Sequence, residues 1–396
     1  MSCFKGLLLG SLFALPVQAE TLPEVVVVAS QLRPADLVAV PAGITVLDAS
    51  LVEAASVQHF EELIPLVPNV NWSGGSSRAR YFQIRGTGEL EQYEGAPNPS
   101  VGFIVDDIDL SGIGGVATTF DVARVEVLRG PQGTRYGANA LAGLIYVETG
   151  QPTADPGAEL VVTGGSDDTL AAGGVVHGPV AGFGDELTFR VAVQQYRSDG
   201  FRHNAFLGRD DTSDQNELTA RAKLRWQPAA DVSLQLTAFH VNLDNGYDDF
   251  NLDNTYTTYA DKPGKDAQQS DAASLRGTVA LGNVADLVSI TGVASSDIVY
   301  SFDADWGNDD FWSPYLYDFT QRFDRQRDTV SQEFRLVSAP DGRLVGADWV
   351  AGVYLLSLHE TEQRRDAGIC GASACGAEIV LDPLPVSSDY EATNLA

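Results

Sequence analysis

A strict two-residue alternation in the second half of the chain most constrains what it can fold into. In the stretch 217–228 the odd positions carry Thr219, Arg221, Lys223 and Arg225, and the even positions carry Leu218, Ala220, Ala222, Leu224 and Trp226. The stretch 186–196 repeats the pattern. A period of two predicts β-strands with one polar and one apolar face. In a soluble sandwich the polar face would meet water, whereas in a membrane barrel the apolar face would meet lipid.

The connections between the expected strands favour the barrel. Short turns and long loops alternate along the chain, the turns near 179–185, 228–231, 282–286 and 339–346, and the loops near 198–216, 244–271, 302–321 and 361–387. Turns at one rim and loops at the other are typical of outer-membrane barrels. Trp226, Tyr196 and Tyr300 lie near strand ends, where we expect an aromatic girdle. About ten strands run from Ala158 to Ala396, too few for a wide lumen, so we expect part of a longer barrel.

The N-terminus predicts export. Lys5 precedes an apolar run, Gly6–Leu15, and the small residues up to Ala19 follow it. The run is too short to span a bilayer, so we expect a signal peptide that is cleaved after Ala19. The alternative is a buried helix of a cytosolic fold. An exported chain that spans lipid without an apolar helix needs a closed barrel, because every backbone polar group must be paired internally.

Charge and cysteine content exclude several functions. The net charge is −29, from 54 acidic and 25 basic residues, which argues against a nucleic-acid partner. The charge fits a solvated acidic surface or, alternatively, an acidic mouth that attracts cations. After export the close pair Cys370 and Cys375 predicts a local disulfide. The histidines are scattered, so we expect no metal site.

The region from Glu20 to about Pro152 follows a different pattern and predicts a small α+β unit. Strands are expected at 43–48, 81–86 and 101–107. A helix is expected over Ser56–Asn69, with Ser56 as its N-cap and Pro65 and Pro68 ending it. A Gly-rich segment, 124–149, then lies between two apolar strand-like runs.

This segment, together with Phe82–Gly86 upstream, closely resembles the plug domain of TonB-dependent outer-membrane receptors. The resemblance implies an α+β plug inside a transmembrane antiparallel β-barrel of about 22 strands, of which roughly the first ten are present here. It implies localisation to the bacterial outer membrane, in contact with its lipid. The expected divisions are the signal peptide 1–19, a TonB-box segment 20–30, the plug 31–153 and the N-terminal part of the barrel 157–396.

The resemblance also assigns residues to plug packing and gating. Glycines allow close backbone approach and positive φ, and arginines can bond to acidic groups that line the barrel. The residues are Arg85, Gly86, Arg129, Gly130, Pro131, Gly133, Arg135, Gly137 and Gly143. An alternative is that the arginines hold the plug without taking part in transport.

The mature N-terminus is the second element that the resemblance explains. The expected TonB box comprises Leu22, Pro23, Glu24, Val25, Val26, Val27, Val28 and Ala29. Such a run can add as a strand to a partner sheet. The implied partner is the periplasmic domain of TonB, energised by inner-membrane ExbB and ExbD. The alternative is that these valines form the first strand of the plug itself.

The loops 246–262 and 302–319 are rich in aromatic and acidic residues. They would suit a ligand with aromatic rings or a cationic group, although a plain aromatic rim with acidic tips fits too. The candidate ligand-binding residues are Trp72, Arg78, Arg80, Tyr93, Tyr247, Trp306, Trp312 and Tyr315. The resemblance implies a ferric siderophore as cargo, with cobalamin, haem or a glycan as alternatives. Iron would enter only as part of the transported chelate, and no cofactor is expected.

Two other classes compete with an importer. The segment Gly112–Ala117 matches G-x-G-x-x-A, but too little helix follows it for a dinucleotide site. No catalytic residues are therefore expected, and the chain is not predicted to be an enzyme. A passive porin or an adhesin is the second alternative, but it would need neither a plug nor a valine strand ahead of it.

Overall fold

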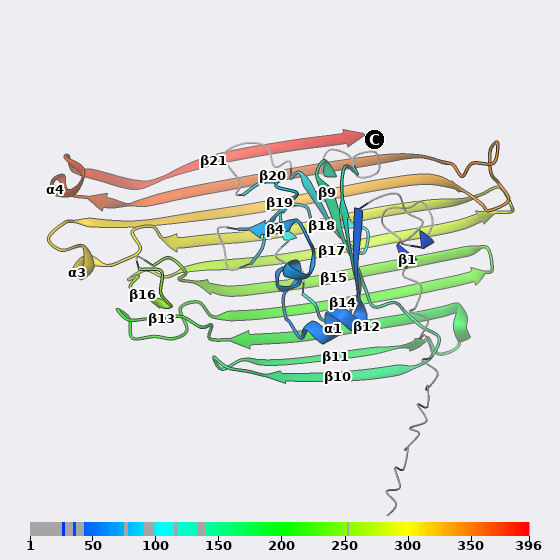
Figure 1. The fold of residues 1–396 in the computed structure, drawn as a ribbon, viewed down its shortest axis with the longest axis horizontal. Coiled ribbons are helices and arrows are strands. Elements are labelled where there is room, and N and C mark those ends of the chain that lie inside the picture. Colours follow the sequence, from blue (N-terminus) through cyan, green and yellow to red (C-terminus); the bar gives the residue numbers. More distant parts are fainter. Residues whose placement is uncertain are drawn as a thin grey trace, which may run out of the picture.

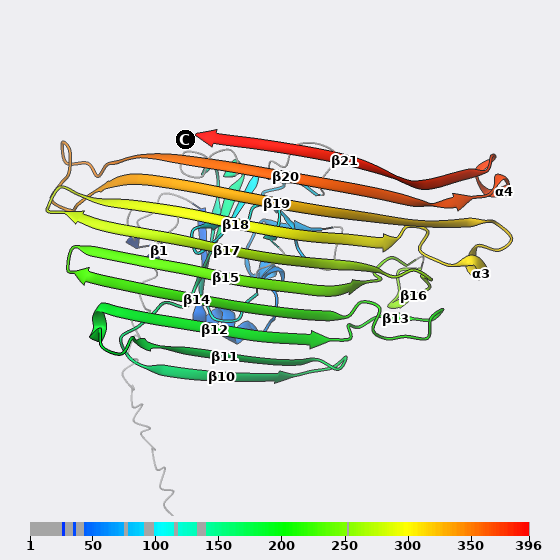
Figure 2. The same ribbon diagram turned by 180° about the vertical axis from the view of Figure 1, so that it is seen from behind.

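The computed structural model describes residues 43–74, 78–90, 99–114, 118–132, 140–251 and 253–395, together with the backbone of 26–27 and 35–36. A large sheet forms one face of the molecule, and a smaller unit, the plug, packs against it. The plug lies in front of the sheet in Figure 1 and behind it in Figure 2. None of the helices in these ranges is long and apolar enough to cross a membrane.

The large sheet has ten strands, and each described strand pairs antiparallel with its neighbour in the chain order of the sheet. The expectation of an antiparallel barrel portion with about ten strands is confirmed. The strands are β10 (Gly157–Gly164), β11 (Leu170–Pro179), β12 (Leu187–Ser198), β14 (Gln215–Ala229), β15 (Val232–Tyr247), β17 (Gly264–Leu281), β18 (Ala285–Asp303), β19 (Tyr317–Ser338), β20 (Val350–Cys370) and β21 (Ile379–Leu395).

The predicted alternation of short and long connections holds from β11 to β19 but fails after β19, where 339–349 is longer than 371–378, and the loops are shorter than predicted. The turn rim of the sheet carries the connections 180–186, 230–231, 282–284 and 339–349, and the loop rim carries 199–214, 248–263, 304–316 and 371–378. The strands extend into the predicted loops because their period-two pairing continues past the apolar band. The last strand likewise starts earlier than expected, at Ile379.

Several short elements lie in the loop-rim connections. Strands β13 (His203–Asn204) and β16 (Thr257–Thr258) pair parallel to each other. Helix α3 (Asp309–Trp312) lies between β18 and β19. Helix α4 (Ala372–Cys375) lies between β20 and β21, where a disulfide joins Cys370 to Cys375.

The two faces of the large sheet have opposite character. On β14, Glu217, Thr219, Arg221 and Lys223 are buried toward the plug, whereas Trp226 is exposed on the other face. The polar face is therefore the inner one, as a plugged barrel requires.

The girdle expectation is wrong for two of its three residues. Tyr196 and Tyr300 occupy positions of their strands that face inward, toward the plug. The ring of Tyr196 contacts His59, and the ring of Tyr300 contacts Tyr247. One position along a strand reverses the face.

The plug is built on a five-stranded sheet in the order β3-β8-β9-β6-β7. Its core is continuous with three inward apolar residues of β15, Phe239, Val241 and Leu243. The strands are β3 (Gly43–Asp48), β8 (Val122–Arg129), β9 (Gly143–Thr149), β6 (Val101–Val105) and β7 (Ile108–Asp109), with a separate hairpin of β4 (Val70–Ser73) and β5 (Tyr81–Ile84). The strand expected at 43–48 is confirmed, whereas those expected at 81–86 and 101–107 each end two residues earlier, at Ile84 and Val105, where turns begin.

The expected helix from Ser56 is wrong in its start. Helix α1 (Ala49–Ala55) precedes it and is capped by Asp48, whose Oδ1 accepts a hydrogen bond from the Leu51 backbone N–H at 2.9 Å. Ser56 ends α1 in the left-handed region, with φ 52°. A 3₁₀ helix, η2 (Phe60–Leu66), follows and contains Pro65, so Pro65 does not end the helix as predicted.

Most of the expected TonB box lies outside the described residues. Within it, β1 (Val26–Val27) pairs antiparallel with β2 (Ala35–Asp36). Two valines of the box are thus already paired with a later segment of the same chain. The predicted signal peptide, 1–19, also lies outside the described part.

Candidate functional site: the interface between plug and barrel

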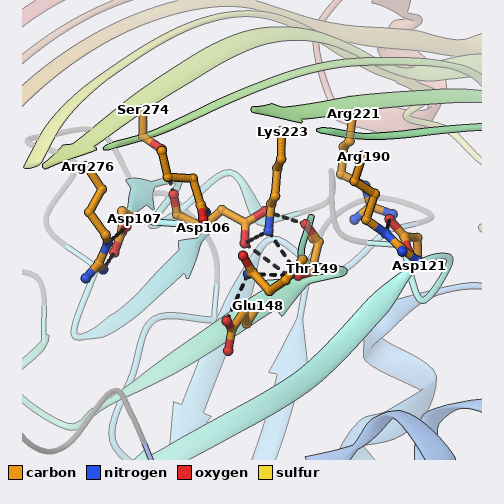
Figure 3. Close-up of polar contacts among 12 residues, drawn as sticks. Asp106, Asp107, Asp121, Glu148, Thr149, Arg190, Arg221, Lys223, Ser274 and Arg276 are labelled. Atoms are coloured by element: carbon orange, nitrogen blue, oxygen red, sulfur yellow. Dashed lines mark hydrogen bonds and ion pairs between the residues drawn. The ribbon is translucent and has the colours of Figure 1, made fainter. Parts of the chain in front are cut away.

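Near the turn rim, cations of the large sheet hold anionic turns of the plug. The turn between β6 and β7 consists of Asp106 and Asp107, with φ of 46° and 72°. Both positive values fit a tight mirror-image hairpin turn. Lys223 on β14 donates to Asp106 Oδ1 at 2.7 Å, and Arg276 on β17 donates through Nε to Asp107 Oδ2 at 2.8 Å. Figure 3 shows both side chains reaching from the sheet onto this turn.

The pair Lys223–Asp106 is almost completely buried, with side-chain exposures of 2% and 4%. Asp106 also accepts two bonds from Thr149, from the backbone N–H at 3.0 Å and from Oγ1 at 2.6 Å. Lys223 donates in addition to the Thr149 carbonyl at 3.0 Å. A buried pair is tolerated when further hydrogen bonds satisfy both partners, and this condition is met here.

A second turn of the plug is held in the same way. Arg190 on β12 pairs with Asp121, donating through Nε at 3.0 Å, and Arg221 on β14 donates to the Phe120 carbonyl. We call these contacts, with those of Lys223 and Arg276, the inner tier. In the inner tier the barrel supplies the cations and the plug supplies the anions and carbonyls.

Closer to the loop rim the polarity is reversed. Arg78 of the plug donates to Glu61 at 2.7 Å and to Glu217 of β14 at 2.9 Å. Glu217 also accepts from Asn245 at 3.0 Å and lies 2.9 Å from His59 Nε2. Burial alone would lower the pKa of Arg78, but the charges of Glu217 and Glu61 outweigh it and raise the pKa.

Arg80 extends this outer tier by pairing with Asp266 of β17. In the outer tier the plug therefore supplies the arginines and the barrel supplies the carboxylates. The barrel is cationic in the inner tier and anionic in the outer tier, and the plug carries the opposite charges. A plug that was shifted by one tier or inverted would therefore bring like charges together. Such an arrangement specifies one position of the plug.

A cavity of about 970 Å³ lies between the plug and the first strands of the sheet. Its lining reaches from Phe201 and Asp249 near the loop rim to Gln151 and Thr153 near the turn rim. Arg190 of the inner tier also lines it. The cavity therefore follows the interface from one rim toward the other.

Comparison with known proteins matches this architecture. Residues 36–144 match the family model described as TonB-dependent Receptor Plug Domain. The crystal structure of the ferric yersiniabactin uptake receptor FyuA from Yersinia pestis aligns over 89% of this chain and 61% of its own, with a TM-score of 0.71 and 18% identity. The chain belongs to the TonB-dependent receptors, as a plug with part of the barrel.

Other similar proteins are of the same kind. The ferripyoverdine receptor of the outer membrane of Pseudomonas aeruginosa aligns with a TM-score of 0.69 and 14% identity, over 93% of this chain and 50% of its own. The pesticin receptor of Yersinia pestis is 28% identical over 186 residues, which is 46% of this chain and 27% of that protein. The chain thus spans well under two thirds of these relatives. Like other members of the family, this protein is located in the outer membrane.

The structure places two of the predicted gating residues of this receptor, Arg85 and Arg129, next to Gly43 at the start of β3. Arg85 is exposed and adopts φ 54°. Arg129 donates to the Pro68 carbonyl at 3.3 Å, and its buried Nε has no hydrogen-bond partner among the described residues. Gly133, Arg135 and Gly137 lie outside the described residues, so their predicted roles stay predictions.

Among the predicted glycines, Gly143 shows the clearest structural requirement. A Cβ added there would lie 2.3 Å from the Leu128 carbonyl oxygen, because β8 and β9 approach closely. Gly86 and Gly130 adopt φ of 76° and 149°. Pro131 follows Gly130 directly after β8.

The predicted ligand residues separate into two groups. Arg78 and Arg80 are buried in the outer tier, where their guanidinium groups bind carboxylates of the receptor itself. Trp72 is exposed on β4, and Tyr93 lies outside the described residues. At the loop rim, Tyr247 and Trp306 both contact Phe250, whereas Trp312 packs on Tyr317 and Tyr315 is exposed.

Sequence reasoning missed the barrel half of the interface. Of Glu217, Lys223, Asp266 and Arg276, only Lys223 was assigned to the polar face of a predicted strand, and Asp266 fell within the predicted loop 244–271. The alternation places them on the inner face, but the sequence does not show which plug residue each one meets. The usable signal was their charge, because an ionised group facing a plug needs a partner of opposite sign.

Proposed function

We propose that this receptor takes part in TonB-dependent active import across the outer membrane. The observation that carries the proposal is the two-tier interface. Buried ion pairs fix the position of a plug with high specificity, while their net contribution to stability is small compared with an apolar core of the same size. A plug held in this way can be seated accurately and still be displaced by an applied force.

The N-terminal segment provides the point at which force would act. The valines of Leu22–Ala29 precede the plug in the chain, and β3, the edge strand of the plug sheet, follows them. An exposed strand can add to a partner sheet through main-chain hydrogen bonds. The proposed partner is the periplasmic domain of TonB, energised by ExbB and ExbD. The pairing of β1 with β2 would have to open first.

We infer that the cargo is a ferric siderophore. The solved structures named above are a ferric yersiniabactin uptake receptor and a ferripyoverdine receptor. Cobalamin is the main alternative, because a vitamin B12 transporter of Photobacterium profundum is 26% identical over 212 residues, 52% of this chain and 34% of that protein. Haem or a glycan would use the same mechanism. The receptor itself would need no cofactor and catalyse no reaction.

Deleting residues 22–29 in cells that lack other receptors for the same cargo tests the proposal. Uptake of labelled ferric siderophore should stop, while binding to the cells should stay unchanged. The matched pair Val27→Pro and Val27→Thr refines the test, because proline removes a backbone N–H whereas threonine keeps it. Unchanged uptake after the deletion would instead support a passive porin, and binding without any uptake in the unmodified receptor would support an adhesin.

A further inference from the structure

A small pocket lies at the loop rim and is lined in part by the connections that contain β16 and α3. Four aromatic side chains line it, Tyr247, Phe250, Phe302 and Trp306, together with the carboxyl group of Asp303. Its volume is about 10 Å³. A space of this size holds one group as large as a water molecule.

Asp303 and Asp305 are both buried, their carboxyl groups lie next to each other, and Asp303 has far fewer hydrogen-bond donors. Asp305 accepts bonds from the Gly307 N–H at 3.0 Å, from Trp312 Nε1 at 3.1 Å and from the Phe319 N–H at 2.8 Å. Asp303 is 5% exposed; its Oδ1 accepts a long bond from the Asp305 N–H at 3.4 Å, and its Oδ2 has no hydrogen-bond donor within the described ranges. A buried carboxylate oxygen without a partner is costly, so Asp303 is suited to a ligand that supplies a donor and a positive charge.

The other two carboxylates of the lining are already engaged. Asp248 accepts from Asn204 at 2.8 Å and from Thr258 at 2.7 Å, and Asp249 accepts from Arg202 at 2.7 Å. The pocket thus offers Oδ2 of Asp303 together with aromatic faces. Calcium would require six to eight oxygen ligands, so this set fits a monovalent group better.

The aromatic rings are arranged as a rigid wall. Phe250 and Trp306 are stacked, with centroids 5.2 Å apart and planes 13° apart, and Phe302 meets Phe250 edge-on at 5.2 Å. Trp306 adopts φ 62°, an unfavourable conformation for a bulky residue, beside the turn that Asp305 holds. Aromatic faces attract cations, and the attraction is largest where water is excluded.

The charge of the surrounding loops has the sign that a cation needs. Asp309 and Asp310 are exposed beside the pocket, in helix α3. Lys262 pairs with Asp318. The excess of acidic side chains at this rim would concentrate cations near the pocket.

We propose that this pocket binds one primary ammonium group, with an N–H donated to Asp303 Oδ2 and the charge facing Phe250, Phe302 and Trp306. The group comes either from free ammonium or from the end of a larger molecule captured at the loop rim. Only the second source rests on the proposed import function, where it would select cargo that carries a free amine.

Calorimetric titration of the purified receptor in detergent tests the proposal. Ammonium, methylammonium, butylammonium and potassium chloride are added at a constant ionic strength set with sodium chloride. Saturable binding of ammonium or of the alkylammonium ions is expected. Asp303→Asn should weaken it at least about tenfold, because it removes the charge of a buried acceptor. Trp306→Leu should weaken it about threefold or more by removing a cation–π face.

Asp310→Asn is the matched control, because it makes the same charge change on an exposed residue of the connection that follows Asp303. It should leave the affinity within about twofold, since exposed charges are screened by salt. Binding of butylammonium without binding of ammonium would show that the bound ammonium group belongs to a larger molecule. Equal affinity in Asp303→Asn and the unmodified receptor, or equal affinity for potassium and ammonium, would overturn the proposal. Import is separable, because deletion of residues 22–29 should leave this binding intact.

Discussion

At the scale of single residues, Lys223 and Asp106 show how the plug is held. Both side chains are buried, and each has further bonds to Thr149. The sequence separation of the pair is 117 residues, so only the fold brings them together. We expect removal of one partner of such a pair to reduce the stability of the fold strongly, and removal of both partners to reduce it much less.

Lys223→Met should therefore destabilise the receptor by about 3–5 kcal/mol, because Asp106 would be left as an uncompensated buried charge. Denaturant unfolding in detergent, followed by tryptophan fluorescence, measures the change. Arg343→Met is the control, since the pair Arg343–Asp348 is exposed and should contribute at most about 1 kcal/mol. The double variant Lys223→Met with Asp106→Asn should recover part of the loss, and a double variant as unstable as the sum of both would contradict this account.

Asp48 gives a second prediction at this scale. Its side chain caps α1, and Asp48→Ala should cost about 1 kcal/mol of local stability. Hydrogen bonds from Ser50 and from the Leu51 backbone lower the pKa of Asp48. The capping contribution is therefore present above the unfolded-state pKa and is lost as pH falls through the lower folded-state value.

Hydrogen exchange of the α1 amides across an acidic pH series measures both effects. Protection should decrease at the acidic end in the unmodified receptor and should already be low in Asp48→Ala. Glu53→Ala, on the exposed side of the same helix, should change little. Equal protection in all three proteins would show that α1 is held by packing alone.

At the scale of elements, the contact between β8 and β9 sets the shape of the plug sheet. Gly143→Ala would force a Cβ to within 2.3 Å of the Leu128 carbonyl oxygen and 2.6 Å of Ile84 Cδ1. Overpacking of this kind costs about 1–3 kcal/mol. Loss of amide protection in β8 and β9 would report it. Gly164→Ala on β10 is the control, because its nearest new contact is at 4.0 Å.

The helical part of the plug shows why local patterns were insufficient at this scale. Ser56 is a good N-cap residue and precedes apolar residues at helical spacing, so the predicted start was reasonable. Asp48 is an equally good cap, and the structure begins α1 there. Val52 of α1 and Phe60 and Ile64 of η2 pack into the same core, so tertiary packing fixes two short helices with a break at Ser56, and no local signal at Ser56 reports that packing.

At the scale of the whole molecule, the outward face of the large sheet is the surface that lipid would cover. Val293 on β18 is 44% exposed on this face, and Asp297 lies on the same face of the same strand, nearer to the loop rim. A charge in the middle of the apolar band costs about 2–4 kcal/mol, and one near the interface costs about 0–1 kcal/mol.

Val293→Arg should therefore reduce folding into lipid vesicles much more than Asp297→Arg does. The fraction that reaches the heat-resistant, protease-protected form in gel analysis measures this. Similar yields for both variants would mean that the apolar band lies elsewhere on the strands, whereas failure of both would point to a general intolerance of β18 to substitution.

The sequence by itself determined the period-two strands and the polar face, because these depend on spacing along the chain. It also carried the Gly-rich segment through which the plug resembles its family. Only the tertiary structure decided which charges meet across the interface, since the depth of the plug and the register of ten strands set those distances. It likewise decided that Phe239, Val241 and Leu243 face inward, because their side chains pack into the apolar core of the plug.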